Sequence, residues 1–265
     1  MTNWQKIALA SVVGLSGCGR SAAPPGKLQV FAAASLAEPF TELGRRYEAA
    51  HPGVSITFNF AGSNVLRLQI EQHAPADVFA SANEAQMKAL LDGGLVNSDS
   101  VRVFAGNRLT IIVPSSNPAH VVAFADLAKP GLKLVAADKA VPAGAYFEKL
   151  LERAAARTEY GNSFSSAVLA NIRSREENVE AVVTKVRLGV ADAGIAYQSD
   201  LHGSAGAFLT GIDIPPDINP PAEYPIATIA HGDAPELARD FESFVLSPEG
   251  QSILAAHDFL MTPTK

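Results

Sequence analysis

Four predicted helix starts in the chain carry small residues, and such starts can bind anions. At the first, the apolar run LQVF at residues 28–31 leads through three alanines to Ser35 and a helical pattern. The free N–H groups and positive dipole end of a helix start attract negative charge. Ser35 and Glu38 also have capping-box spacing, so Ser35 could cap its own helix and still donate its proton to a ligand.

The second helix start is the sequence FAGSN at residues 60–64. An apolar strand pattern ends there and a helical pattern begins, so Ser63 or Asn64 is the candidate cap. Gly62 has no side chain, which lets the backbone come close to a ligand. A second serine hydroxyl would therefore stand beside a free helix end.

The other two helix starts are VPAG at residues 141–144 and the segment around Asn178. Proline suits the first helical turn, and the small Ala143 after it would leave backbone N–H groups open. Asn178 can cap a helix whose first free N–H belongs to Val179. Helix starts are common and most are satisfied by caps or water, so none of the four decides a function alone.

Enzyme signatures are missing from the sequence. It has no Gly-x-Ser-x-Gly elbow, no His-Glu-x-x-His zinc motif, no P-loop and no dinucleotide fingerprint. Asp77 and Asp192 each adjoin an apolar strand pattern, where capping of the strand end is favoured over catalysis. A secreted hydrolase that uses either aspartate stays open as an alternative.

The N-terminal residues predict export and lipid attachment. Residues 7–15 are an apolar segment behind Lys6, too short for a permanent membrane span and typical of a secretory signal. The sequence LSGC then resembles the lipobox of bacterial lipoproteins, which implies a signal peptide at 1–17 and a lipid anchor on Cys18. Because Cys18 is the only cysteine, no internal disulfide can form. Residues 18–26 are expected to be a tether.

Length and charge limit the remaining choices. The 265 residues are enough for two domains of ~120 residues after a leader. No basic run occurs, so nucleic acid is not an expected partner. The net charge of −6 offers an anion no long-range attraction, so an anion site would depend on local dipoles.

Strand and helix patterns alternate along the chain, which predicts an α/β fold with largely parallel strands. Strands are expected at residues 28–33, 54–60, 77–80, 109–113, 132–136, 192–196 and 224–230. Helices are expected at residues 36–50, 64–73, 84–92, 143–155, 178–187, 234–246 and 248–256. The Pro- and Gly-rich residues 211–225 are expected to form a long loop.

Two of the apolar strand segments are candidates for crossings between two lobes. One is NRLTIIVP at 107–114, which follows a stretch expected to be irregular, and the other is YPIATIA at 224–230. Two crossings would place residues 27–107 plus 226–265 in lobe 1 and residues 108–225 in lobe 2. A two-strand hinge with a ligand cleft between the lobes would follow.

Five motifs stand together in the order seen in one protein family. They are VFAAASL at 30–36, FAGSN at 60–64, APADVFASAN at 74–83, VPAG at 141–144 and GIAYQSD at 194–200. Over most of residues 27–264 the chain resembles the molybdate-binding proteins of bacterial ABC importers, a branch of the periplasmic-type solute-binding proteins. The resemblance implies the type II fold of that class, in which two α/β lobes are joined by two crossing strands.

The resemblance also implies an oxyanion site without a cationic side chain. Carried over by motif, the molybdate ligands are Ser35, Ser63, Ala143, Val179 and Tyr197. The serines would each give a hydroxyl and an N–H, Ala143 and Val179 an N–H, and Tyr197 its hydroxyl, up to seven donors in all. Gly62 and Asn64 replace serines that are common in the family, which leaves Ser63 as the only hydroxyl in that motif.

A site made only of donors suits a fully deprotonated dianion such as molybdate. Hydrogen phosphate carries a proton that needs an acceptor, and leaving it unpaired costs ~1–3 kcal/mol, or roughly 5- to 150-fold in affinity. Sulfate needs no acceptor either, so only cavity size can reject it. Tungstate is nearly the size of molybdate and should bind similarly.

These inferences predict a monomeric, lipid-anchored receptor that faces the periplasm or the cell exterior. It would capture molybdate or tungstate for an ABC permease and would need no cofactor and catalyse no reaction. The alternatives are a receptor for sulfate, phosphate or ferric ion, and the secreted hydrolase. Ferric-binding relatives typically use neighbouring tyrosines, whereas the tyrosines here are dispersed along the chain.

Overall fold

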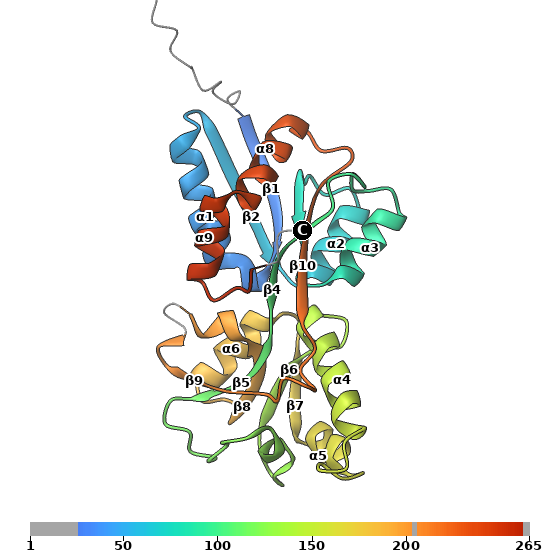
Figure 1. The fold of residues 1–265 in the computed structure, drawn as a ribbon, viewed down its shortest axis with the longest axis vertical. Helices are drawn as coiled ribbons and strands as arrows, with labels where there is room; N and C mark the ends of the chain where they lie inside the picture. The colour runs from blue at the N-terminus through green and yellow to red at the C-terminus, as the bar shows by residue number, and fades with distance from the viewer. Residues whose placement is uncertain (1–25, 203–205, 262–265) are drawn as a thin grey trace, which may run out of the picture.

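The computed structural model describes residues 26–202 and 206–261, which form two lobes stacked end to end (Figure 1). The predicted signal peptide, the lipid site at Cys18 and the tether as far as residue 25 lie outside the described residues. Each lobe is built on a five-stranded sheet with helices packed against it.

The sheet of the first lobe has the order β2-β1-β3-β10-β4. Its strands are β1 (Gly26–Ala33), β2 (Val54–Ala61), β3 (Val78–Ala80), β4 (Arg102–Asn107) and β10 (Ala222–Thr228). β1 pairs in parallel with β2 and β3, whereas β10 runs antiparallel between β3 and β4. The helices of this lobe are α1 (Ala37–Ala50), α2 (Ser63–Glu71), α3 (Glu84–Asp92), α8 (Pro235–Leu246) and α9 (Pro248–Ala256).

The sheet of the second lobe has the order β7-β6-β8-β5-β9. Its strands are β5 (Leu109–Pro114), β6 (Leu134–Ala137), β7 (Ile172–Glu176), β8 (Ala193–Tyr197) and β9 (Leu209–Ile212). β6 is parallel to β7 and β8, and β5 is antiparallel to β8 and β9. The helices of this lobe are α4 (Pro142–Ala155), α5 (Phe164–Asn171) and α6 (Val179–Arg187), with short 3₁₀ helices at Phe124–Ala128 and Gln198–Leu201.

Two chain segments connect the lobes, as expected for a type II periplasmic-binding-protein fold. β4 leads through Arg108 directly into β5, and the chain returns to the first lobe in β10 (Figure 1). β10 begins at Ala222, so the lobe boundary predicted between residues 225 and 226 falls inside a strand of the first sheet. The exact lobe limits stay a prediction.

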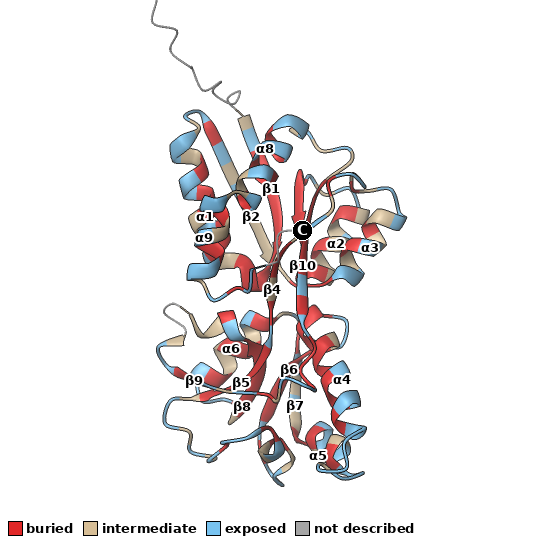
Figure 2. Cartoon of the chain, viewed as in Figure 1, coloured by how far each residue is buried: buried red, intermediate tan, exposed pale blue. Residues whose placement is uncertain are grey.

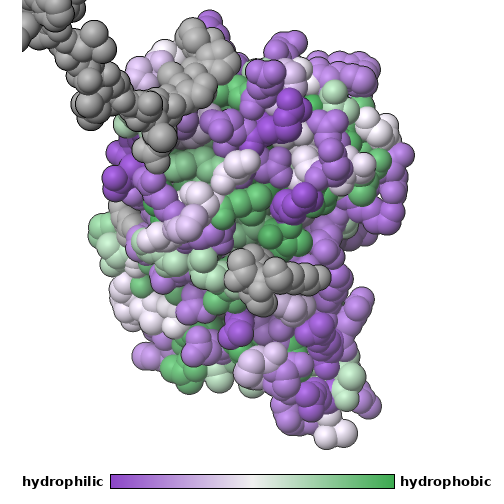
Figure 3. All heavy atoms as spheres, turned by 45° about the horizontal axis from the view of Figure 1, so that its top comes forward, coloured by the Kyte–Doolittle hydropathy of each residue, from purple (hydrophilic) through white to green (hydrophobic). Residues whose placement is uncertain are grey.

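The apolar faces that the sequence pattern marks are turned inward. On α1, Phe40, Leu43 and Tyr47 are fully buried, at the spacing of one helical face. Figure 2 shows the same division elsewhere, with buried residues along the sheets and on the helix sides that face them. On the face in Figure 3, hydrophilic residues cover most of the visible surface, with hydrophobic residues between them. Within the described parts of the chain, no helix combines the length and apolarity that a membrane crossing requires.

Several predicted elements need correction. The stretch before Asn107 is not irregular but contains β4, and the expected loop at 211–225 contains the end of β9 and the start of β10. β7 and α5 were not predicted. β7 is an edge strand whose Arg173 and Arg175 are exposed, so it lacks the apolar run that marks a buried strand.

Candidate functional site

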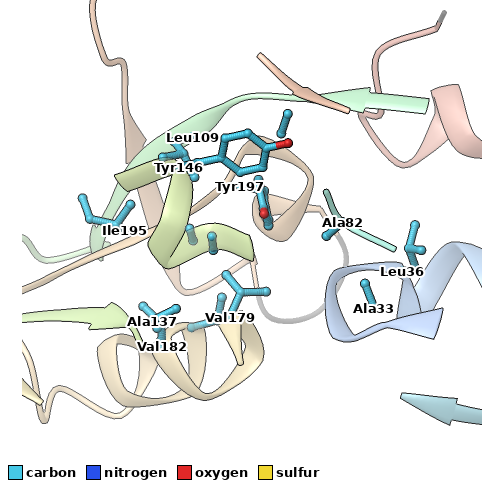
Figure 4. Packing of buried hydrophobic residues seen from close by; sticks show 14 of the residues in the cluster. Ala33, Leu36, Ala82, Leu109, Ala137, Tyr146, Val179, Val182, Ile195 and Tyr197 are labelled. Carbon is cyan, nitrogen blue, oxygen red and sulfur yellow. The ribbon is translucent and has the colours of Figure 1, made fainter. Parts of the chain in front are cut away.

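All five predicted ligand residues line one cavity between the lobes, which we call the interlobe cavity. Its walls are Ala33, Ala34, Ser35, Ala61, Gly62, Ser63 and Ala82 from the first lobe, and Val141, Pro142, Ala143, Asn178, Val179 and Tyr197 from the second. Figure 4 shows Ala33 and Ala82 on one side and Val179 and Tyr197 on the other. The structure thus brings together the positions predicted from separate motifs, while their role as ligands stays a prediction.

Ser35 does not cap its helix, so the predicted capping box with Glu38 is wrong. A turn of 3₁₀ helix, η1 (Ala34–Leu36), precedes α1, and the N-cap of α1 is Leu36 without a side-chain hydrogen bond. Ser35 therefore lies inside the helical turn rather than before it. Its hydroxyl oxygen is instead 3.0 Å from the Tyr224 hydroxyl of β10, and both residues are buried.

Ser63 is the first residue of α2, so the prediction that Ser63 or Asn64 caps this helix is wrong, while the role of Ser63 as a ligand stays a prediction. The N-cap is Gly62, and neither Ser63 nor Asn64 caps the helix. The Ser63 hydroxyl oxygen accepts a hydrogen bond from the Ala82 backbone N–H at 3.1 Å. Because a hydroxyl also has one proton to donate, that proton is still available to a ligand.

The two helix starts in the second lobe agree with the sequence. Pro142 opens α4, and Ala145 N–H donates to Val141 C=O at 2.9 Å, so the N–H of Ala143 precedes the helical ladder. Asn178 caps α6, as predicted, because its side-chain oxygen accepts from Ala181 N–H at 2.9 Å. Val179 is the first residue of α6, so its N–H also lacks a partner within the helix.

Tyr197 ends β8 with its side chain fully buried at the interlobe cavity. Its hydroxyl makes no hydrogen bond of ordinary geometry within residues 26–202 and 206–261. Burial raises the pKa of Tyr197 well above its usual value, and the neighbouring Tyr224 adds to this effect. The hydroxyl therefore keeps its proton at neutral pH, and an anion in the cavity would supply the acceptor it lacks.

The interlobe cavity is neutral at its surface. None of the described residues that line it is charged. Asp200 lies just behind it and accepts a hydrogen bond from Tyr197 N–H at 2.8 Å. Burial, opposed by the Tyr197 N–H hydrogen bond and aided by the carboxylates of Glu180 and Glu38, raises the pKa of Asp200 to about 7. An anion here would be held by helix N–H groups and hydroxyls rather than by an ion pair.

The two aspartates considered for catalysis have structural partners away from the interlobe cavity. Asp77 accepts from the backbone N–H of Gln29 at 2.8 Å and of Ala234 at 2.9 Å. Asp192 accepts from Lys133 N–H at 2.8 Å. These are the strand-end contacts that the sequence favoured. The described part of the chain also contains no group of three His, Cys, Asp or Glu residues arranged to hold a metal ion.

Sequence reasoning missed the residues that support the serines. Ala82 lies in a motif that was recognised, but no role was given to its N–H. Tyr224 was placed in a strand, and 189 residues separate it from Ser35. No local pattern reveals a contact over that distance, since it depends on where β10 enters the first sheet.

The sequence profile of the bacterial extracellular solute-binding proteins matches residues 28–260. The chain belongs to this family. Membership agrees with a cleft between two lobes and supports a binding role rather than a catalytic one. It also agrees with the resemblance that the five motifs indicate.

The names of individual relatives state a ligand, which the family description does not. The chain is 35% identical over 262 residues to the molybdate-binding protein ModA of Mycobacterium tuberculosis, covering 96% of this chain and 95% of that protein. The periplasmic molybdate-binding protein of Azotobacter vinelandii has a similar structure, with a TM-score of 0.77, 19% identity and 89% and 99% of the two chains covered. The sulfate-binding protein SubI of M. tuberculosis gives 0.80 at 18% identity over 89% and 87%. The last two likenesses show the fold alone.

Proposed function

We propose that this protein captures molybdate, and also tungstate, outside the cytoplasm and delivers it to an ABC permease. The observation that carries the proposal is the convergence of four helix starts and the unpaired Tyr197 hydroxyl on one neutral cavity. Such a site offers donors on several sides and presents no charged side chain to its ligand. A tetrahedral dianion without protons is the ligand class that fits.

The Ser63 contact strengthens the choice of a ligand that only accepts hydrogen bonds. Ser63 already accepts from Ala82 N–H, so its proton is the part left for the ligand. Charge-assisted hydrogen bonds of this kind each contribute ~1.5–3 kcal/mol, so several can offset the desolvation of a dianion.

The family supports a binding role, and the named relative supports molybdate as the ligand. The M. tuberculosis relative is a molybdate-binding protein, and it aligns over nearly the whole of both chains. Attachment to a membrane through Cys18, a position facing the periplasm or the cell exterior, a monomeric state and the absence of a cofactor belong to this proposal. Replacing Cys18 with alanine should move the protein from the membrane fraction to the soluble fraction.

Isothermal titration of the purified protein with molybdate, tungstate, sulfate and hydrogen phosphate tests the ligand. We expect tight binding of molybdate and tungstate and much weaker binding of the other two anions. Preference for sulfate would replace our choice with a sulfate receptor. The absence of heat and of any thermal shift with molybdate at micromolar protein would reject the proposal.

A further inference from the structure

The proposed function does not yet assign a role to the hydrogen bond between Ser35 and Tyr224. The two hydroxyl oxygens are 3.0 Å apart, and either could be the donor in the empty protein. Ser35 lines the interlobe cavity, whereas Tyr224 stands behind it on β10 and is fully buried. Tyr224 therefore touches a ligand residue without lining the cavity itself.

A bound dianion would settle the direction of this hydrogen bond. A fully deprotonated anion can only accept, so Ser35 would have to give its single proton to the anion. Ser35 then has only lone pairs left for Tyr224, and Tyr224 must be the donor. We propose that Tyr224 is a positioning residue that donates to Ser35 and so directs the Ser35 proton at the oxyanion, an inference that rests on the proposed function.

Ser63 shows the same arrangement on the other wall of the first lobe. Its oxygen accepts from Ala82 N–H, a group that can only donate, so the Ser63 proton is free to point elsewhere. Tyr224 gives Ser35 the equivalent partner from a side chain. Both serines would then be fixed as donors toward the cavity before the ligand arrives, which spares the cost of orienting them on binding.

The surroundings of Tyr224 suit a fixed donor. Its ring makes edge contacts with Phe104 and Phe259 of the first lobe and with Tyr197 of the second, at centroid distances of 6.4, 5.3 and 5.7 Å. Burial raises the pKa of Tyr224 well above its usual value, so the hydroxyl keeps its proton. The ring is held in place and its proton is always present.

A double-mutant cycle distinguishes positioning through Ser35 from a general structural effect. Molybdate affinity is measured by titration for the parent, for Tyr224→Phe, for Ser35→Ala and for the double variant. We expect Tyr224→Phe to weaken binding about three- to tenfold, the usual effect of one buried hydrogen bond. In the Ser35→Ala background, Tyr224→Phe should have no further effect on the molybdate affinity, because the Ser35 hydroxyl to which Tyr224 donates is absent.

The matched cycle uses Ser63→Ala, whose hydroxyl is held by Ala82 instead. There Tyr224→Phe should cost the full three- to tenfold. Parental affinity in Tyr224→Phe, or an equal loss in the Ser35→Ala and Ser63→Ala backgrounds, would overturn the inference. If the parent binds molybdate and only the coupling is missing, the proposed function stands; if the parent does not bind molybdate, both fall.

Should Tyr224→Phe not fold, 3-fluorotyrosine at position 224 provides a second measurement. It keeps the ring and the hydroxyl but makes the hydroxyl a stronger donor. Molybdate binding should then tighten in the parent background and stay unchanged when Ser35 is alanine. Weaker or unchanged binding in the parent background would contradict the inference.

Discussion

A Cβ atom on Gly62 would lie 2.6 Å from the carbonyl oxygen of Glu177, which belongs to the other lobe. The same atom would lie 2.7 Å from the side-chain oxygen of Asn64. The two lobes are therefore in contact at the rim of the interlobe cavity, with room for a hydrogen atom but not for a methyl group. This close approach explains why a residue without a side chain is needed at position 62.

Gly62→Ala should weaken molybdate binding by at least tenfold, because the methyl group would meet backbone of the opposite lobe. The backbone at Gly62 has φ −59° and ψ 135°, which alanine adopts without strain, so any loss of stability should come from the contacts of the methyl group with Glu177 and Asn64 and not from the backbone. Titration and thermal unfolding test the two parts separately. Gly93→Ala is the control, since a Cβ there would meet its nearest neighbour at an ordinary 3.5 Å. Parental affinity in Gly62→Ala would show that the lobes need not approach this closely.

Tyr197→Phe should separate binding from stability. Its hydroxyl lies near that of Tyr224 but makes no hydrogen bond of ordinary geometry within the described residues, so removing it should change the melting temperature of the empty protein little. Molybdate affinity should fall by ~1–3 kcal/mol. Tyr47→Phe should lower the melting temperature and leave the molybdate affinity unchanged, because the Tyr47 hydroxyl donates to Asp240 at 2.5 Å, away from the cavity. Loss of stability without loss of affinity in Tyr197→Phe would argue against its role as a ligand.

Ser63→Ala should lower both the molybdate affinity and the stability of the protein. The change removes a proton from the ligand site and leaves the buried Ala82 N–H without its acceptor. Each effect should cost ~1–3 kcal/mol, one in the free energy of binding and one in the free energy of unfolding. Urea unfolding and titration measure them. The exposed Ser166→Ala serves as control and should change the molybdate affinity by less than about twofold.

Glu242 should make the protein less stable as the pH rises. Burial, opposed by nearby Arg102 and aided by Asp99, raises the pKa of Glu242 from 4.5 to about 7. The folded protein then holds a proton that the unfolded chain loses near pH 4.5, so the free energy of unfolding falls between about pH 4.5 and 7. The free energy of unfolding of Glu242→Gln should therefore exceed that of the parent by ~1–3 kcal/mol above pH 7 and match it below pH 4.

The measurement for Glu242 is urea unfolding of parent and variant across this pH range. The difference between the two proteins is the quantity to follow, because other groups titrate in both. Glu152→Gln, which removes a carboxylate from the exposed side of α4, is the control. A difference for Glu242→Gln that does not change with pH would refute the role of Glu242.

The two-lobed α/β architecture and the positions that line the interlobe cavity could be predicted from the sequence, while the role of those positions as ligands stays a prediction. Ser35 and Ser63 follow strands of the first sheet and Ala143 follows a strand of the second, and an alternating strand–helix chain places such turns at one edge of each sheet. The resemblance to a known family selected these helix starts from the others.

What the sequence did not predict depends on three-dimensional packing. The spacing fitted a capping box at Ser35, but Ser35 lies inside a 3₁₀ turn and its hydroxyl forms a hydrogen bond with Tyr224 instead. β7 escaped notice because an edge strand with exposed arginines has no continuous apolar run. The proximity of Gly62 to Glu177 is a contact between lobes, which only the relative position of the two sheets determines.

The position of β10 has a consequence for the order in which the chain can fold. β10 lies between β3 and β4 in the first sheet, yet it begins only at Ala222. Until that part of the chain has been synthesised, the first lobe lacks an interior strand and leaves the edges of β3 and β4 unpaired. The second sheet is complete by Ile212 and is drawn from a continuous segment. The lobe that begins first along the chain is therefore the one that finishes last.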